Sequence, residues 1–260
     1  MSSEPDISVI ITSHNYGHFL ENAIGSVLEQ TRPANEVVVV DDGSEDMTGA
    51  IARRYGLPVI ELPKVGACRA KAAGIAATTG TFFVTLDADD RLEPTYLEQT
   101  AKVMTGSPRT GVVYTGVSYF GTRHGHQRPK RYSKARLALG NFVHGAALIR
   151  REAYEQTAGY GSVELQSHED WHIYLSIAER GWHFQGTDRT RLWYRQHGPS
   201  RNSISPERFH QSWRAVACLH PTLYRPSLEV WYLAHRIQVD LLPRFRGRFA
   251  GGRGGAFLPT

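Results

Sequence analysis

The stretch that decides the fold is "TFFVTLDADDRLEP", residues 81–94, in which an apolar and β-branched run leads directly into acidic residues. The apolar part does not alternate with polar residues, which is typical of a strand covered on both faces of a parallel sheet. The carboxylates of Asp87, Asp89 and Asp90 follow it, and Pro94 marks the expected start of a helix. Because clustered like charges repel one another, a compensating cation is expected beside them.

The rest of the first half repeats this strand pattern and alternates it with helix-like segments. Further apolar runs occupy residues 7–12, 36–41 and 57–62. Between the runs lie segments with spaced apolar positions, residues 17–30, 44–56 and 67–80. Ser44 is the expected N-cap of the second segment, and Gly56 and Gly80 are expected to end the second and third. Repeated strand–helix order predicts a doubly wound α/β sheet with ligands beyond the carboxyl ends of its strands.

The pattern becomes less regular from about residue 111. We expect a strand or hairpin, a mostly polar surface loop, a strand passing into a short helix, an amphipathic helix, and a strand ending in a loop. These segments are, in order, residues 111–121, 122–136, 142–160, 168–182 and 189–200. A helical extension is expected over residues 206–260, and its Arg- and Gly-rich end is expected to be disordered.

The composition restricts the class of protein. With 260 residues, 41% of them hydrophobic, the chain can form one large domain, or one domain with a tail. A net charge of +5 favours an anionic partner, namely a nucleotide, a phospholipid surface, a phosphorylated substrate or nucleic acid. Cys68 and Cys218 predict neither a disulfide framework nor a zinc site, which indicates a reducing compartment. Without a signal-peptide pattern or a run of about 18 apolar residues, a soluble or peripheral protein is expected.

Several motifs in order carry a resemblance to a known family. They are "ISVIITSHNYGHFLENAIGSVLEQT" from Ile7, "VVVVDDGSEDMT" from Val37, "VGACRAKAAGIAATTGTFFVTLDADDRLEPTYLE" from Val65, "HEDWHIYLSIAERGW" from His168 and "YRQHGPSRNSIS" from Tyr194. Over residues 6–205 the chain resembles glycosyltransferase family 2, which has the GT-A fold. The resemblance implies a Rossmann-like α/β sandwich with a mostly parallel central sheet flanked by helices. It also implies a nucleotide-binding half of about residues 1–110 and an acceptor-binding half of about residues 111–205.

The resemblance further implies a metal-dependent enzyme of the inverting type. Such an enzyme moves a sugar from a nucleoside-diphosphate sugar, here expected to be a UDP-sugar, to a hydroxyl of a saccharide or lipid-linked acceptor. Mn²⁺ or Mg²⁺ is the expected cofactor, because hard cations bridge carboxylates and phosphates. The chain lacks the Gln-x-x-Arg-Trp motif of processive members, so transfer of a single sugar is expected.

On the donor side, the resemblance assigns roles to the residues that follow the strands. The residues expected to hold the base and the ribose are Thr12, His14, Asn15, Asp41 and Asp42. Asp42 is favoured as the acceptor for a uracil-like imide N–H. Asp87 is expected to face the ribose or the metal, and Asp89 to bind the metal. Asp90 is left to local structure, and a purely structural alternative is that Asp89 and Asp90 complement the dipole of the following helix.

The helix before this acidic stretch departs from the family pattern. Where the family commonly has Ala-Arg-Asn-x-Gly, residues 70–74 read "AKAAG", which puts Lys71 in the Arg place and Ala72 in the Asn place. Lys71 is still expected to contact the nucleotide with its positive charge, although it lacks the planar fork of an arginine. Arg69 is a candidate to compensate.

On the acceptor side, the resemblance makes Asp170 the catalytic base, which takes the proton of the acceptor hydroxyl. The residues expected to line the acceptor or sugar pocket are His144, His168, Glu169 and Trp171, and Gly145 matches the same acceptor-side region as His144. The alternatives are that the two acids are ordinary first-turn residues of a helix, and that Trp171 belongs to the core. His197 is expected to bind the metal or a phosphate, the alternative being a surface residue. Ser200 and Arg201 are weaker phosphate candidates.

Basic segments suggest a location and leave rival functions open. The polar loop before residue 136 and the C-terminal tail are both rich in Lys and Arg. We therefore expect a cytoplasmic protein that touches the inner face of an anionic membrane. The alternative is that these residues form a solvated basic face. A nucleic-acid-binding protein and a non-catalytic sugar-nucleotide binder are the rival functions. No nucleic-acid partner is expected, because such a role leaves the carboxylates without a purpose.

Overall fold

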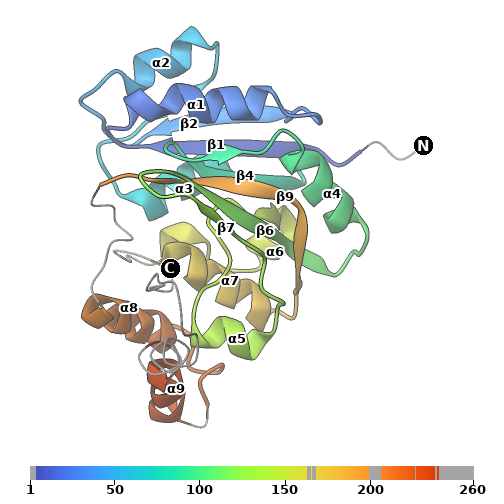
Figure 1. Cartoon of the computed structure of the whole chain (residues 1–260), viewed down its shortest axis with the longest axis vertical. Coiled ribbons are helices and arrows are strands. Elements are labelled where there is room, and N and C mark those ends of the chain that lie inside the picture. The colour runs from blue at the N-terminus through green and yellow to red at the C-terminus, as the bar shows by residue number, and fades with distance from the viewer. Residues whose placement is uncertain are drawn as a thin grey trace.

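The computed structural model describes residues 4–162, 165, 168–198, 206–225, 227–237 and 239 of the chain (Figure 1). One mixed sheet with strand order β3-β2-β1-β4-β8-β6-β9-β5 runs through it, and β7 pairs with β6. The strands are β1 Ile7–Ser13, β2 Glu36–Asp41, β3 Val59–Glu61, β4 Phe82–Asp87, β5 Arg91–Leu92, β6 Thr110–Gly121, β7 Gly125–Gln127, β8 Leu148–Arg150 and β9 His183–Gln196. The predicted apolar runs are all strands.

The first four strands are parallel, as expected from their unbroken apolar runs. β1 pairs with β2 and with β4, and β2 pairs with β3, always in parallel register. The short strand β8 is antiparallel to both β4 and β6, whereas the long pair β6 and β9 is parallel. β8 therefore joins a regular parallel half to a half built mainly on β6 and β9.

Helices cover both faces of the sheet. They are α1 Gly17–Leu28, α2 Thr48–Arg54, α3 Ala67–Ala76, α4 Tyr96–Thr105, α5 Lys134–Leu139, α6 Arg151–Glu155, α7 Glu169–Glu179, α8 Pro206–Cys218 and α9 Leu228–Arg236, with the 3₁₀ turn η1 Tyr160–Ser162. Alternate strand residues belong to different cores: Val9 packs with α1, α2 and α4, whereas Ile10 packs with α3 and α7. This alternation explains why the strands are apolar throughout.

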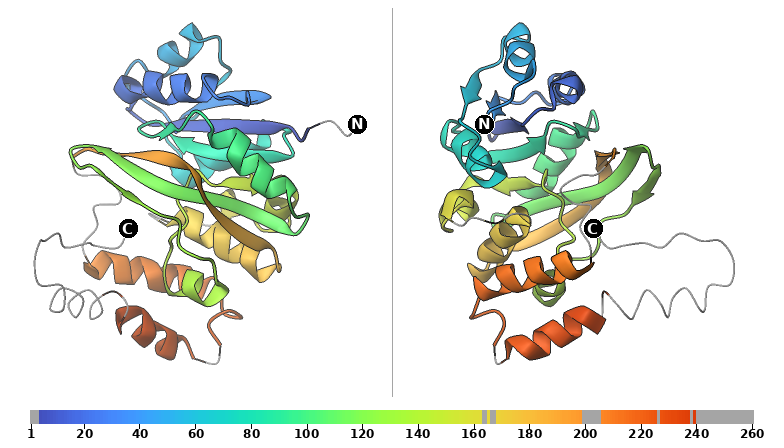
Figure 2. Two further views of the ribbon diagram at one scale, coloured as in Figure 1. Left: turned by 45° about the vertical axis from the view of Figure 1, so that its right-hand side comes forward. Right: turned by 90° about the vertical axis from the view of Figure 1, so that its left-hand side faces the viewer.

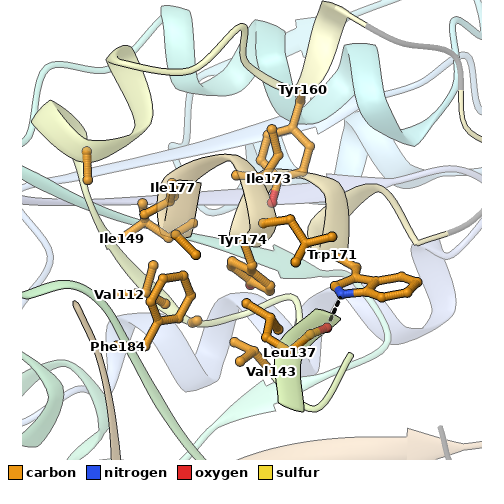
Figure 3. Close-up of a cluster of buried hydrophobic side chains, with 14 of the residues drawn as sticks. Val112, Leu137, Val143, Ile149, Tyr160, Trp171, Ile173, Tyr174, Ile177 and Phe184 are labelled. Atoms are coloured by element: carbon orange, nitrogen blue, oxygen red, sulfur yellow. Dashed lines mark hydrogen bonds between the residues drawn. The ribbon is translucent and has the colours of Figure 1, made fainter. Parts of the chain in front are cut away.

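Helix α7 packs in the core that contains Ile10. Figure 3 shows Ile173, Tyr174 and Ile177 of this helix among residues of β6, β8 and β9. Trp213 and Val216 of α8 are also buried in this core, so the C-terminal helices extend it (Figure 2). None of the helices in the described ranges combines the length and apolar character that crossing a membrane requires.

Two expected helix boundaries are wrong. Helix α2 begins at Thr48, and Ser44 instead accepts a hydrogen bond at Oγ from the Asn15 amide, 2.9 Å away. Helix α3 ends at Ala76, four residues before Gly80, and the Gly80 amide instead donates to Ser8 Oγ (3.0 Å) at the start of the segment that leads into β4. Gly56 does follow the end of α2, with a φ of +70° and its amide bonded to the Arg53 carbonyl.

The later segments broadly follow the expected order. Residues 142–160 contain β8 and α6, residues 168–182 contain α7, and β9 spans residues 183–196. The predicted surface loop at residues 122–136 also contains β7 and the start of α5, because backbone pairing with β6 orders part of a polar sequence. The predicted tail, residues 241–260, lies outside the described residues.

Candidate functional site

The carboxyl ends of β1, β2 and β4 meet at one edge of the sheet. In the parallel register Thr12 lies beside Asp87, and Ser13 lies beside Asp41. The Thr12 hydroxyl donates to Asp87 Oδ1 at 3.2 Å, so the first residue of the predicted donor site touches the acidic stretch. The chain therefore brings together residues from three separate motifs, as expected for a doubly wound sheet.

The acidic pair after β2 is buried and braces the surrounding loops. Asp42 accepts hydrogen bonds from the amides of Val65 (2.6 Å) and Gly66 (2.8 Å), and Asp41 accepts one from the Ser44 amide (2.9 Å). Each Asp42 oxygen keeps a further lone pair. The contact of Asp42 with the imide of a nucleotide base stays a prediction. The structure shows in addition that this carboxylate holds the loop of Val65 and Gly66.

His14 and Asn15 hold the loop after β1 against the loop after β2. His14 Nδ1 lies 2.8 Å from the Asp42 carbonyl oxygen, and Asn15 Oδ1 accepts from the Glu45 amide at 2.8 Å. Asn15 has a φ of +57°, a conformation that costs energy for a side-chain-bearing residue and often occurs at functional sites. Both residues lie where the nucleotide was predicted, and their ligand contacts stay predictions.

The acidic stretch after β4 has three different environments. The Asp87 side chain is 42% exposed, whereas Asp89 is paired with His197, whose Nε2 lies 2.9 Å from Asp89 Oδ2. Asp90 is buried and accepts a hydrogen bond from the Arg195 amide of β9 at 2.9 Å. Burial, followed by the charge of Asp87, raises the pKa of Asp89. Asp90 therefore has a structural contact, but its partner belongs to the distant strand β9 instead of the following helix, where its role was expected.

The Asp89–His197 pair is the best candidate for a metal site in the described part of the chain. There, no group of three or more histidine, cysteine or acidic side chains is arranged to hold a metal ion. A hard divalent cation nevertheless binds proteins through one or two carboxylates when substrate phosphates and waters complete its coordination. A carboxylate beside an imidazole, with Asp87 nearby, is a donor set that suits Mn²⁺ or Mg²⁺.

Lys71 lies at the centre of the acidic groups that the resemblance placed on opposite sides of the site. Its ammonium is 2.9 Å from Asp170 Oδ1, 3.4 Å from Glu169 Oε1 and 3.9 Å from Asp87 Oδ1, and its side chain is 1% exposed. The predicted contact of Lys71 with a nucleotide stays a prediction. Its observed partners are the acids of α7, which sequence spacing did not indicate.

Asp170, the expected base, is enclosed at the first turn of α7. Its Oδ1 accepts from Lys71 and from the Tyr160 hydroxyl at 2.7 Å, and its Oδ2 faces Gly145, where an added Cβ would lie 2.8 Å away. Burial raises the pKa of Asp170, and Lys71 partly opposes that rise. His168 lies two residues before Asp170, at the N-cap of α7. Its φ of +66° is a second strained backbone conformation in the candidate site.

The expected pocket residues divide into buried and partly accessible ones. Trp171 is completely buried and donates its indole N–H to the Leu137 carbonyl at 2.7 Å, so the core alternative describes it better than a pocket wall (Figure 3). His144 Nε2 accepts from the Thr115 amide at 3.1 Å, and burial lowers the pKa of His144 to about 3. Glu169 is buried beside Lys71, and His168 packs its ring near Phe209. Ser200 and Arg201 lie outside the described residues.

Three contributors have roles that were not predicted from the sequence, although Gly145 was expected, with His144, to lie on the acceptor side. Tyr160 donates to the candidate base, and Gly145 gives that base room. The third, Arg195, donates to the Asp89 carbonyl oxygen at 2.9 Å and stacks on Phe19 and Phe120. Arg195 lies within the motif that begins at Tyr194, and Gly145 follows His144, but neither position indicates these roles, because the roles depend on contacts between distant segments.

The described surface also has shallow hollows away from these groups. One, of about 400 Å³, is lined by residues 129–132 and 184–186, and another, of about 460 Å³, by residues 102–103 and 185–189. Neither shares a lining residue with the carboxylate cluster. The chemically distinctive groups, not these hollows, therefore define the candidate site.

Known proteins resemble this chain in sequence and in structure. A glycosyltransferase from Rickettsia prowazekii, described as uncharacterized, is 30% identical over 186 residues, which is 66% of this chain and 58% of that protein. An uncharacterized glycosyltransferase from Nostoc sp. is 38% identical over 108 residues, 39% of this chain and 33% of that protein. The chain thus spans little more than half, or less, of these relatives.

Solved structures support the fold. The Staphylococcus aureus TarS fragment 1–349 in complex with UDP-GlcNAc superposes with a TM-score of 0.70 at 18% identity, over 90% of this chain and 73% of that one. The Pyrobaculum calidifontis mannosyltransferase PcManGT in complex with GDP-Man and Mn²⁺ gives 0.62 at 20% identity, over 98% and 78%. These likenesses confirm the predicted GT-A fold. The Glycosyl transferase family 2 profile matches residues 8–159, more than half of the chain, and the chain therefore belongs to glycosyltransferase family 2.

Proposed function

We propose that the protein is an inverting glycosyltransferase that moves a single sugar from a nucleoside-diphosphate sugar, with a UDP-sugar favoured, to a hydroxyl of a saccharide or lipid-linked acceptor. The observation that carries this proposal is the convergence of donor-side and acceptor-side acids on one ammonium. Lys71 Nζ lies 2.9 Å from Asp170 and 3.9 Å from Asp87. The end of β4 is expected to bind the diphosphate of the donor. A single displacement requires the base to lie close to that end, as Asp170 does.

Asp87, Asp89 and His197 would hold the metal ion together with the phosphates of the donor. A bound divalent cation would neutralise the negative charge that develops on the departing diphosphate. The Asp89 carboxylate and the His197 imidazole, which lie together, support this assignment. The balance of charge around Lys71 supports it too. Three acids, Asp87, Glu169 and Asp170, surround a single buried lysine, so further positive charge is favourable there.

Asp170 would act as the general base. The acceptor O–H bond breaks, its electron pair forms the new bond to the anomeric carbon, and the proton passes to the Asp170 carboxylate. On the opposite side of that carbon the bond to the diphosphate oxygen breaks, and its electron pair leaves with the diphosphate, which inverts the configuration. The raised pKa of the buried Asp170 carboxyl makes it a stronger base than an exposed aspartate.

A ligand screen followed by base removal tests this function. The unmodified protein is heated with a panel of UDP- and GDP-sugars, with and without Mn²⁺, and a donor is expected to raise the melting temperature when the metal is present. Asp170→Asn is expected to lower transfer by at least about 100-fold while the metal-dependent stabilisation by the donor persists. Asp89→Asn is expected to abolish that stabilisation.

Glu155→Gln is the matched control, because this carboxylate lies exposed at the end of α6. It is expected to leave both donor binding and transfer unchanged. Full transfer by Asp170→Asn would contradict the assignment of the base. Salt-sensitive binding of RNA, with no response to any nucleotide sugar, would instead favour the nucleic-acid-binding alternative.

A further inference from the structure

Lys71 is a buried cation that its surroundings must compensate. Moving an ammonium out of water costs several kcal/mol unless it is paired and hydrogen-bonded. Here the 1%-exposed side chain reaches from α3 to α7 and contacts Asp170 and Glu169, with the Tyr160 ring 5.6 Å away. Asp87 Oδ1 is also 3.9 Å from the ammonium, farther than either acid of α7. Because the lysine is nearly inaccessible and lies nearer to Asp170 and Glu169, it is placed to act through these two acids.

The two oxygens of Asp170 have different environments. Oδ1 accepts hydrogen bonds from Lys71 Nζ (2.9 Å) and from the Tyr160 hydroxyl (2.7 Å). Oδ2 lies against Gly145, and among the described residues it has no hydrogen-bond donor. Burial and the neighbouring Asp170 charge raise the pKa of Tyr160 well above its usual value, so its hydroxyl remains a donor. An oxygen that already accepts two hydrogen bonds is the poorer base of the pair.

We propose that Lys71 and Tyr160 are positioning residues that hold Oδ1 of Asp170, so that Oδ2 is the atom that takes the proton of the acceptor. The inference rests on the proposed glycosyl transfer. In that step the acceptor O–H bond breaks, its electron pair forms the bond to the anomeric carbon, and the proton binds Oδ2. The diphosphate departs with the electrons of the bond it leaves, while Lys71 and Tyr160 keep their own protons throughout.

Gly145 belongs to the same arrangement. A Cβ at this position would lie 2.8 Å from Oδ2 and 3.7 Å from Lys71 Nζ, closer to the carboxylate than a non-bonded contact permits. The backbone of Gly145 is further held by the Thr85 hydroxyl, which donates to its carbonyl at 3.1 Å. The missing side chain therefore leaves space beside the oxygen that would receive the proton.

The test measures release of the nucleoside diphosphate from a panel of UDP- and GDP-sugars with Mn²⁺, with water as the acceptor where no other is known. With the most active sugar, Tyr160→Phe is expected to lower kcat by about tenfold, since it removes one hydrogen bond to Oδ1. Lys71→Met is expected to lower kcat by about 100-fold or more, and Lys71→Arg to recover part of that loss because it restores the charge. The donor KM is expected to stay within about twofold in each variant.

Tyr224→Phe is the matched control, because this tyrosine is also buried and donates to a carbonyl, that of Ala138, without touching Asp170. It is expected to leave kcat unchanged even if it lowers the melting temperature. Wild-type kcat in Tyr160→Phe would overturn the proposal. So would a rise of donor KM in Lys71→Met as large as its fall in kcat, because Lys71 would then contact the donor directly.

Failure of the proposed function would have a different pattern. If the unmodified protein releases no nucleotide from any sugar in the panel, or if Asp170→Asn keeps full kcat, glycosyl transfer through this base is wrong. If Asp170→Asn loses activity while Lys71→Met and Tyr160→Phe keep it, only the positioning role is wrong. Should Lys71→Met fail to fold, Tyr160→Phe decides the matter, since it leaves the buried ion pair intact.

Discussion

Gly145 matters at the residue scale because it has no side chain next to Asp170. An alanine there would press its methyl group against Oδ2 of Asp170, and the carboxylate would have to move. Displacement of a catalytic group by about 1 Å costs up to about 100-fold in rate, so we expect Gly145→Ala to lower kcat by one to two orders of magnitude, with donor binding retained. Steady-state kinetics with the donor found in the ligand screen will measure this.

Gly25 in α1 supplies the comparison for that prediction. No atom lies within 4 Å of a Cβ built there, and alanine suits a helix better than glycine. Gly25→Ala is expected to keep wild-type kinetics and to raise the melting temperature slightly. Equal activity of the two variants would show that Asp170 tolerates a side chain at residue 145.

Glu36 makes stability depend on pH at acidic values. Its carboxylate accepts from the hydroxyl of Ser8 and from the amides of Thr79 and Gly80. Burial by itself would raise the pKa of Glu36, but these hydrogen bonds outweigh it and lower the pKa to about 2. The folded state therefore binds this proton more weakly than the unfolded state. The stabilising contribution is complete above the ordinary glutamate pKa and is lost as the pH falls toward 2.

Urea unfolding of the unmodified protein and of Glu36→Gln at a series of acidic pH values measures that contribution. The difference in unfolding free energy between the two is expected to be largest near neutral pH and to shrink as the pH falls below about 4.5. The amide keeps the size of the side chain and part of its hydrogen bonding. Parallel curves for the two proteins would contradict the role assigned to Glu36.

At the scale of elements, one carboxylate joins the beginnings of two helices. Asp46 Oδ2 accepts from the first amide of α1, at Gly17 (2.8 Å), and its Oδ1 accepts from the first amide of α2, at Thr48 (2.9 Å). Removing a capping acceptor costs about 0.5–2 kcal/mol per helix. Asp46→Ala is expected to lower the free energy of unfolding by about 2 kcal/mol, measured by urea denaturation.

Two variants sharpen this prediction. Asp46→Asn keeps an acceptor oxygen and is expected to lose less stability than the alanine variant. Ser44→Ala changes the residue that the sequence pattern indicated as the cap. It is expected to cost less than Asp46→Ala, because the Ser44 hydroxyl accepts a hydrogen bond from the Asn15 amide of the neighbouring loop and none from the start of α2. A larger loss for Ser44→Ala would reverse the assignment.

These elements show which parts of the structure were accessible to sequence analysis. The parallel strands were predictable, because burial on both faces requires an unbroken apolar run and little else imitates that pattern at this length. The cap of α2 was not, because Ser44 and Asp46 both have suitable side chains and the choice depends on how the loop meets α1. For Trp171 the sequence left both a pocket wall and the core open, because an aromatic residue in a helix suits either place, and its side chain is buried in the core.

The candidate site was predictable only in part. The acidic residues after β4 and at the start of α7 belong to recognisable motifs, so their identity was accessible. That Lys71 lies between them was not, since a lysine on α3 can point toward solvent or toward α7 with the same sequence. Tyr160 belongs to no motif, and Gly145 was matched only loosely to the acceptor side. The packing of η1 and of the segment before β8 against α7 brings both residues to Asp170.

At the scale of the whole molecule, α9 presents an apolar stripe to solvent. Val230, Leu233 and Ile237 follow one another at helical spacing and are 65%, 62% and 41% exposed, beside the exposed Arg236. An Arg-rich sequence follows this helix in the chain. Apolar residues flanked by arginines favour an anionic lipid surface, where a lipid-linked acceptor would be found, and we propose peripheral binding there.

Sedimentation with lipid vesicles tests that proposal. Binding to vesicles containing anionic phosphatidylglycerol is expected to exceed binding to phosphatidylcholine alone, and Leu233→Ser is expected to reduce it by about tenfold. Met47→Ser is the control, because Met47 is 65% exposed next to α2, at the opposite end of the molecule from α9 (Figure 1). Equal losses in both variants, or no binding by the unmodified protein, would contradict a membrane-binding stripe on α9.

The order of the strands has a consequence for how the protein behaves at high concentration. The described sheet ends at β3, Val59–Glu61, on one side and at β5, Arg91–Leu92, on the other, so its longest strands, β6 and β9, lie inside it. An outer strand with free backbone groups is a template on which a second molecule can add its own strand. The three-residue strand β3 offers little template, but β5 pairs with the outer side of the 14-residue strand β9 only at Leu192 and Trp193. Self-association by strand addition is therefore disfavoured at the β3 side of the sheet, and in the described part of the chain the outer side of β9 is the edge on which a second molecule would add a strand.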